Sequence, residues 1–285
     1  MKRILKWTAI TVVSIVAVLL ILIYGVSEYR LRQKFDIALA PIDVPTDPAG
    51  LDRGRHVFRT RGCEGCHAAG LKGSVFFDQP MLARLVAPNV VRAIKGYSDA
   101  ELARLLRHGV RPNGRGVAVM PSSVFYHLDD ADLGALIAYL RTLPDKGGSD
   151  TLPATSLRLL ARVGVVTGKY NLEPVEITHD APRAPNGPDA VARGRYLAKS
   201  TCTECHGQAL DGTEETPALS VVAGYSPSEF ARLMREGVPR DGRKLKMMGD
   251  VARARFVDFS DEEIGALYAY LSTRMTVARG MGDGG

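Results

Sequence analysis

The sequence predicts an all-α protein in which an N-terminal transmembrane helix precedes two small helical domains in tandem. Three observations support this fold class: a long uncharged segment near the N-terminus, three sequence blocks that each occur twice, and apolar positions that recur with helical spacing. No segment alternates apolar and polar residues for long enough to predict a sheet. The expected divisions are residues 1–40 for the anchor and its flanks, 41–145 for domain one, 146–189 for a linker and 190–285 for domain two.

The N-terminal segment carries no charge between Lys6 and Glu28. As a helix these 21 residues would extend over about 31 Å, enough to cross the hydrocarbon core of a bilayer. A cleaved signal peptide is the alternative, because its apolar region also lies near the N-terminus. The residues 25–27 match a signal-peptidase site poorly, so the sequence favours a retained anchor. Basic residues flank both ends of the segment and do not fix its orientation.

The distribution of charge argues against a nucleic-acid partner. The formal net charge is +6, but residues 1–40 carry six Lys/Arg and only two Asp/Glu, whereas residues 151–285 carry 17 of each sign. The part outside the apolar segment and its flanks is therefore close to neutral. Nucleic-acid binding needs a clustered basic face, and the sequence shows none.

Three blocks recur in the same order and define two copies of one module. GRHVFRTRGCEGCH at 54–67 returns as GRYLAKSTCTECH at 194–206, YSDAELARLLRHGV at 97–110 as YSPSEFARLMREGV at 225–238, and LDDADLGALIAYL at 128–140 as FSDEEIGALYAYL at 259–271. In the last two blocks the apolar residues follow the i, i+3, i+4, i+7 spacing of an amphipathic helix. Capping boxes and stop glycines are expected at Ser98 with Glu101, Ser226 with Glu229, Gly109 and Gly237.

Between the copies, residues 144–190 are rich in Pro and Gly and read as a connector. The segment SLRLLARVGVV at 156–166 could form a short helix lying across the modules, but an amphipathic spacer is the favoured interpretation.

Both copies contain two cysteines three residues apart followed at once by a histidine. The residues are Cys63, Cys66 and His67 in the first copy and Cys202, Cys205 and His206 in the second, and they use all four cysteines. This pattern is the attachment signature of covalently bound c-type haem. Residues three and four apart share one face of a helical turn, so both sulfurs can reach the porphyrin edge while the imidazole lies under the iron.

Other uses of this spacing fit less well. A structural zinc site needs its second ligand pair some 15–20 residues on, whereas Cys66 and Cys202 are 136 positions apart. A thioredoxin-like pair expects a βαβ context, and disulfides would not require a histidine at the same place twice. Because thioether attachment takes place on the non-cytoplasmic face, the domains are expected in a bacterial periplasm and the N-terminus inside, as a single-pass protein of the inner membrane.

A methionine stands in register in each copy as a candidate second axial ligand. Met120 lies ten residues after Val110 and Met248 ten after Val238, both on the segment expected to be a loop between the repeated helices. Proline follows Met120 and stiffens its loop, whereas Met247 stays an alternative to its neighbour Met248. A thioether raises the reduction potential relative to two imidazoles and leaves no open coordination position, so such an iron passes electrons without binding substrate.

With these residues in place, the sequence resembles the tandem class I cytochrome c proteins, and among them the dihaem cytochrome subunits of membrane-bound dehydrogenases. The similar segments are APN (87–89), GYSDAELARLLRHGVRPNGRG (96–116), VMP (119–121), LDDADLGALIAYLRTLP (128–144), TPAL (216–219) and YSPSEF (225–230). The resemblance implies that Pro88 and Pro217 offer their carbonyl groups to the second ring nitrogen of His67 and His206.

The second copy departs from this pattern in two ways. Proline is missing after Met248, and the stretch before FSDEE is three residues longer than in the first copy. The distance from CxxCH to the candidate proline also differs between the copies, at 21 and 11 residues.

The expected function is that of a membrane-anchored dihaem cytochrome c with two covalently attached haem c groups, which is not itself an enzyme. It would relay electrons between a redox enzyme, such as a dehydrogenase or a quinol-oxidising complex, and a respiratory acceptor such as an oxidase, with the direction left open. Two alternatives remain: a dihaem peroxidase, which needs one iron with an exchangeable site, and a dihaem subunit of a haem-copper oxidase.

Overall fold

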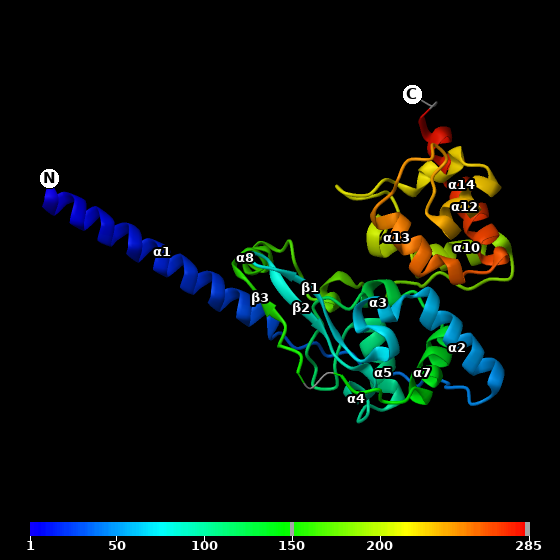
Figure 1. Ribbon diagram of the computed structural model, residues 1–285, viewed down its shortest axis with the longest axis horizontal. Coiled ribbons are helices and arrows are strands. Elements are labelled where there is room, and N and C mark those ends of the chain that lie inside the picture. Colours follow the sequence, from blue (N-terminus) through cyan, green and yellow to red (C-terminus); the bar gives the residue numbers. More distant parts are fainter. Residues whose placement is uncertain (149–150, 283–285) are drawn as a thin grey trace.

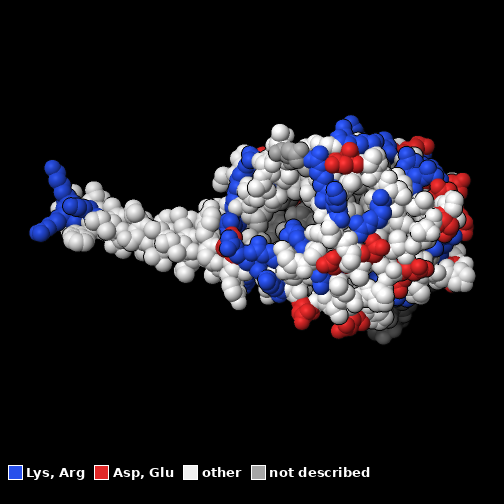
Figure 2. Space-filling view, turned by 90° about the horizontal axis from the view of Figure 1, so that it is seen from below, with Lys and Arg blue, Asp and Glu red and all other residues white. Residues whose placement is uncertain are grey.

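The computed structural model describes residues 1–148 and 151–282, with side chains up to residue 274. Helix α1 (Lys2–Leu31) extends as a rod away from the rest of the chain, and two helical modules follow it (Figure 1). By length and composition α1 could cross a membrane, and none of its apolar window is buried in the protein. Figure 2 shows this rod free of charged side chains between a basic tip and a basic base.

Module one is built on two helices that cross at a glycine. Its helices are α2 (Pro48–Thr60), α3 (Cys63–His67), η1 (Ala69–Leu71), α4 (Val90–Ala93), α5 (Asp99–His108), α6 (Ser122–Phe125) and α7 (Asp130–Thr142). At the α2–α7 crossing, a Cβ on Gly54 would stand 2.0 Å from the carbonyl oxygen of Ala135. The two backbones can approach this closely only because residue 54 has no side chain.

Module two repeats this arrangement. Its helices are α10 (Ala190–Lys199), α11 (Thr203–His206), η2 (Leu219–Gly224), α12 (Pro227–Glu236), α13 (Met247–Ala254), η3 (Phe256–Asp258) and α14 (Asp261–Gly282). A Cβ on Gly194 would stand 1.9 Å from the carbonyl oxygen of Ala266. The α10–α14 crossing is therefore the twin of the α2–α7 crossing.

The expected helix boundaries of the central block are confirmed in both modules. Helices α5 and α12 each begin with a complete capping box, at Ser98 and Ser226, and each ends at a left-handed glycine, Gly109 and Gly237. Buried apolar side chains from the same faces then form one core in each module. The capping residues thus predict where these helices begin and end, and the apolar stripe predicts which face packs into the core.

A small antiparallel sheet stands beside module one and corrects the expectation that no strand would form. Its strands are β1 (Ser74–Gln79), β2 (Ala83–Ala87) and β3 (Ser156–Leu157), in the order β1-β2-β3. The pairing of β1 shifts register between Val75 and Phe77, so the strand lacks the alternation that would predict it. The third strand comes from the linker, about 70 residues away. The helical expectation holds for both module cores.

The linker packs against the end of α1 instead of lying across the two modules. It forms β3, α8 (Leu159–Thr167) and α9 (Glu173–Glu176). On α8, Arg162 donates to the Ser27 hydroxyl at 2.8 Å and to the Glu28 carboxylate at 3.2 Å. Arg30 donates in return to the carbonyl oxygen of Val165 at 2.8 Å. The segment 156–166, expected to be a spacer, therefore forms hydrogen bonds that hold the C-terminal end of α1.

Further along, the linker is bound to module one. The carboxylate of Glu173 accepts a hydrogen bond from the Ser123 backbone at 2.8 Å, and its own N–H donates to Val117 at 2.9 Å. The Tyr126 hydroxyl donates to the carbonyl oxygen of Ala181 at 2.6 Å. Module one, the sheet, the linker and the base of α1 thus form one continuous body.

Candidate functional site

The two CxxCH motifs form matching helical turns, α3 and α11. None of the four cysteines is paired in a disulfide. Burial raises the pKa of Cys63 and of Cys202 to about 12. A site that disfavours a thiolate this strongly suits the neutral thioether of an attached porphyrin better than a thiolate-bound metal. Among the residues that the structure describes, no group of three His, Cys, Asp or Glu could hold a bare metal ion.

Each motif histidine is oriented by a proline carbonyl. The Nδ1 atom of His67 lies 2.8 Å from the oxygen of Pro88, and the Nδ1 atom of His206 lies 2.8 Å from the oxygen of Pro217. Because a carbonyl can only accept, Nδ1 carries the proton and Nε2 keeps its lone pair for a metal. Burial also lowers the pKa of His67, which favours the neutral imidazole that binds iron.

A glycine turn holds each proline against its histidine. Gly73 and Gly212 adopt φ of +86° and +87°, and an added Cβ would stand 2.8 Å from Ala87 O and 2.6 Å from Thr216 O. The N–H of Gly73 donates to the His67 carbonyl at 2.9 Å, as that of Gly212 does to the His206 carbonyl at 3.0 Å. The turn is the same although 21 residues separate histidine and proline in module one and 11 in module two.

A hydroxyl group ties each attachment turn to this segment, and sequence analysis missed both. The Ser74 hydroxyl donates to the Cys66 carbonyl at 2.6 Å, and the Thr216 hydroxyl donates to the Cys205 carbonyl at 2.6 Å. Ser74 directly follows the glycine turn, whereas Thr216 directly precedes the proline. An alignment of the two copies does not pair these residues, so the repeat gave no signal for them.

The register-matched methionines both face a module core. Met120 packs against the core of module one, directly before Pro121 and α6. Met248 packs against the core of module two, whereas Met247 is 55% exposed. The expectation of a loop holds for Met120 but not for Met248, which lies in the first turn of α13. Without a following proline, the longer second segment can continue as a helix from this point.

The residues therefore fit a haem group in each module. One turn supplies two thiols and an imidazole, and a proline carbonyl orients the imidazole. A methionine thioether packs against the core of the same module. A haem bound there supplies a one-electron iron couple, while the protein supplies attachment, burial and ligand orientation.

Contacts between the modules were also missed by sequence analysis. The buried Tyr196 hydroxyl bonds to the Asp132 carboxylate, which also accepts from Arg53 at 2.6 Å. His56 lies 2.9 Å from the carboxylate of Glu263. Polar contacts among α2, α7, α10 and α14 thus join the two modules, and Asp132, Tyr196 and Glu263 are buried within them.

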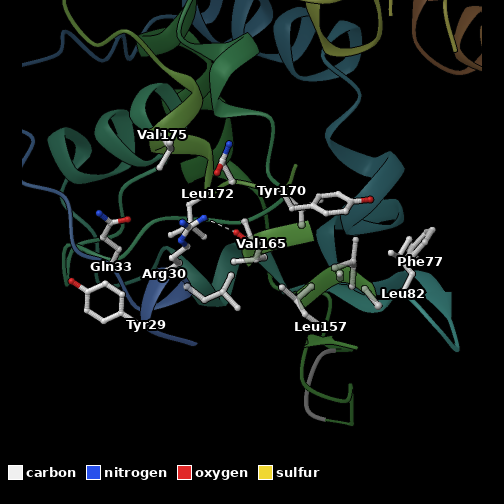
Figure 3. Close-up of a pocket in the computed structure, with 17 residues that line it drawn as sticks. Tyr29, Arg30, Gln33, Phe77, Leu82, Leu157, Val165, Tyr170, Leu172 and Val175 are labelled. Atoms are coloured by element: carbon white, nitrogen blue, oxygen red, sulfur yellow. Dashed lines mark hydrogen bonds between the residues drawn. The ribbon is translucent and has the colours of Figure 1, made fainter. Parts of the chain in front are cut away.

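A cavity of about 550 Å³ lies where α1 meets module one (Figure 3). Its lining comes from the end of α1, the β1–β2 hairpin, residues 118–119 and the linker. The wall is mostly apolar, with Leu82, Val165 and Leu172 labelled in Figure 3, while Arg30 and Gln33 supply polar groups. Val119 on this wall directly precedes Met120 in the sequence, whereas Met120 itself packs against the core of module one.

Comparison with known proteins gives three informative relatives. The fructose dehydrogenase cytochrome subunit of Gluconobacter japonicus is 26% identical over 271 residues, covering 80% of this chain and 54% of the relative. The alcohol dehydrogenase (quinone) cytochrome c subunit of Komagataeibacter europaeus is 24% identical over 277 residues, covering 83% and 58%. A diheme cytochrome c-type protein of Cereibacter sphaeroides is 30% identical over 194 residues, covering 57% and 61%. The chain spans a little over half the length of the first two relatives.

A family model described as cytochrome c matches residues 51–144 and 191–274, which is more than half of the chain. The two matches contain the two attachment turns, their prolines and their methionines. The chain therefore belongs to the cytochrome c family, a family of electron-transfer proteins, and carries two covalently bound haem c groups.

Proposed function

We propose that this protein is a dihaem electron relay, held by α1 in the bacterial inner membrane with both modules in the periplasm. It takes electrons from a dehydrogenase and passes them to the respiratory chain. The observation that carries this proposal is the duplicated cradle, in which Cys63, Cys66 and His67 recur as Cys202, Cys205 and His206 with the same carbonyl contact at each histidine. The division into residues 1–40, 41–145, 146–189 and 190–285 is part of the proposal.

Each iron is proposed to be closed on both faces. His67 and Met120 hold the iron of module one, and His206 and Met248 that of module two. Met248 is partly buried against the core and Met247 is exposed, which supports the choice between the two neighbours. Closed coordination suits electron transfer and opposes the peroxidase alternative, which needs an open iron.

The orientation follows from the attachment chemistry. Thioether formation on the periplasmic side places both modules there, and α1 then enters the membrane at the face where the linker clamps it. The uncharged rod in Figure 2, with basic groups at its tip and its base, supports a retained anchor that exposes charge only outside the hydrocarbon core.

The names of the relatives support a dehydrogenase as donor and a quinone as acceptor. Two of them are named as cytochrome subunits of dehydrogenases, and one of these names carries the word quinone. Quinone reduction takes two electrons and two protons, which matches two one-electron centres. The apolar cavity at the base of α1 supports this acceptor, because a lipid-soluble molecule could enter it from the membrane and lie against module one.

Ligand binding tests the closed irons. The reduced and the oxidised holoprotein are mixed with carbon monoxide and with cyanide, and neither is expected to bind rapidly. Rapid stoichiometric binding at one haem would instead support the peroxidase. Affinity purification from detergent-solubilised membranes, with mass spectrometry of the companions, then separates the donors: a dehydrogenase subunit is expected, and a haem-copper oxidase would contradict the assignment.

A filled cavity tests the acceptor. Ala161 on α8 lines the cavity and is buried, whereas its neighbour Leu160 is 51% exposed and does not line it. In Ala161→Phe, oxidation of the reduced holoprotein by a short-tailed ubiquinone is expected to slow at least tenfold, and in Leu160→Phe to stay unchanged. Equal rates in wild type and Ala161→Phe would remove the quinone from this cavity and leave the relay itself untouched.

A further inference from the structure

We infer that Arg255 is a bridge between the two haem attachment turns, which holds them edge to edge and sets the reduction potential of both centres. One electron then passes directly from one module to the other across this contact. The inference rests on the proposed relay function and names a positioning residue within it.

One guanidinium group touches both turns. Its Nη1 donates to the Glu204 carboxylate at 2.8 Å, and its Nη2 donates to the carbonyl oxygen of Arg61 at 2.5 Å. Glu204 lies between the two cysteines of the second motif, and Arg61 stands two residues before Cys63. The side chain also fills the space beside Gly62, where an added Cβ would stand 2.2 Å from its Nε.

A reciprocal contact ties the turns from the other side. The Arg61 side chain is 4% exposed and donates from Nη2 to the Ser200 hydroxyl at 3.0 Å. Ser200 stands two residues before Cys202, as Arg61 stands two residues before Cys63. Each attachment turn is therefore preceded by a residue that contacts the other module, and the attachment edges of both modules meet at this interface.

The bridge also places positive charge beside both sites. The Arg255 side chain is only 16% exposed, and its Nε lacks a hydrogen-bond partner among the described residues. Its guanidinium group bonds to Glu204, between the two cysteines of the second motif, and to the carbonyl oxygen of Arg61, two residues before Cys63. A single charge thus lies close enough to act on both attachment turns, in surroundings where solvent screens it weakly.

This arrangement has two consequences. A fixed positive charge favours the ferrous over the ferric state, so loss of Arg255 should lower both potentials. The transfer itself needs no bond and no proton: one iron goes from ferrous to ferric as the other goes from ferric to ferrous. The bridge keeps the two attachment edges adjacent, which shortens the path that this electron takes.

The test is a spectroelectrochemical titration of the full-length holoprotein. Arg255→Gln is expected to shift both reduction waves to lower potential, although the substitution lies in module two alone. The waves are assigned in a Met120→His background, which displaces only that of module one. The matched control is Arg253→Gln, two positions away, because Arg253 is exposed and, among the described residues, bonds to Asp250 and the Glu236 carbonyl. It should leave both waves in place.

A second variant guards against misfolding. Glu204→Gln removes the opposite charge from the same bridge and should raise both potentials. A shift confined to module two, or no shift, in Arg255→Gln and Glu204→Gln would overturn the bridge and leave the relay function standing. Rapid carbon monoxide binding by the wild type would overturn the relay function, whereas a shift of both waves would still support the bridge.

Discussion

The two modules share the parts that hold a haem and differ in nearly everything around them. Each has the same helix crossing at glycine, the same glycine turn and the same 2.8 Å contact from a histidine to a proline carbonyl. In the part of the chain that the structure describes, the β1–β2 hairpin belongs to module one, where β2 pairs with β3 of the linker and α8 bonds to the base of α1. The added elements converge on the cavity of Figure 3. The module next to α1 thus keeps the same attachment turn and the same histidine contact as its twin.

The additional residues of module two lie at the interface with module one and not near α1. Its extra length lies between Met248 and Phe259, and this is the stretch that supplies Arg255 to the interface. Module one therefore gained contacts with the rod, while module two gained the contact between the attachment turns. Insertions next to the duplicated attachment turns therefore determine which neighbouring segments each module contacts.

The largest expected effect tests what the modules share. Gly54→Ala and Gly194→Ala each place a methyl group about 2 Å from a helix carbonyl of the partner helix. Each should destabilise its own module by about 3 kcal/mol, because the helices must separate. Hydrogen exchange read by mass spectrometry should show faster exchange in α2 and α7 for the first variant and in α10 and α14 for the second. Unequal losses would show that the crossings are not equivalent.

The next effect concerns the axial ligands. Met120→His and Met248→His should each lower the potential of one centre by on the order of 0.1 V, because imidazole stabilises ferric iron more than a thioether does. A redox titration with the two waves resolved provides the measurement. Met247→His, the neighbouring substitution, should leave both waves unchanged. A fall in Met247→His and none in Met248→His would reverse the assignment in module two.

Substitution at a pair of equivalent glycines should affect the stability of the two modules differently. Gly134 and Gly265 occupy the same position in the repeated block. A Cβ on Gly134 would stand 1.9 Å from the carbonyl oxygen of Asp43, whereas Gly265 has nothing within 4 Å. Gly134→Ala should therefore cost module one about 1–2 kcal/mol, and Gly265→Ala should cost module two nothing or stabilise its helix slightly. Equal thermal shifts would mean that the segment before α2 does not pack on α7.

The sequence predicts the repeated helices and the attachment turns because their signals are local. Capping boxes, stop glycines and the i, i+3, i+4 stripe depend on neighbours within one or two turns, and CxxCH is contained in five residues. The β1–β2–β3 sheet was missed because β1 shifts register and β3 lies far along the chain. A short strand of this kind is stabilised by its partners more than by its own residues.

Arg255 was missed for a related reason. The residues next to Arg255 in the sequence do not indicate its role. That role depends on two acceptors far away in the sequence, the Glu204 carboxylate and the Arg61 carbonyl oxygen. The usable signal was the three-residue excess before FSDEE, which sets module two apart from its twin. Length differences between internal copies are thus a better guide to such contacts than the residues they contain.

The smallest effect concerns a histidine that module two lacks. His108, at the end of α5, pairs with His179 of the linker, with 2.9 Å between their Nδ1 atoms. The equivalent position in module two is Glu236. Burial, followed by the charge of His179, lowers the pKa of His108 to about 4. The titratable and charged groups that face it are His179, Arg107, Arg183, Arg104 and Tyr126.

The sign of the pH dependence follows from this lowered pKa. As pH falls below about 6.5 the unfolded chain takes up a proton at His108 before the folded chain does, so folding loses stability. The contribution is fully present above about 6.5 and is lost as pH approaches 4. Urea unfolding of module one, followed by pulsed hydrogen exchange at one labelling pH, should show this acid loss in wild type and a smaller one in His108→Gln. Glu236→Gln should leave the module-one slope unchanged, and an undiminished slope in His108→Gln would place the acid sensitivity elsewhere.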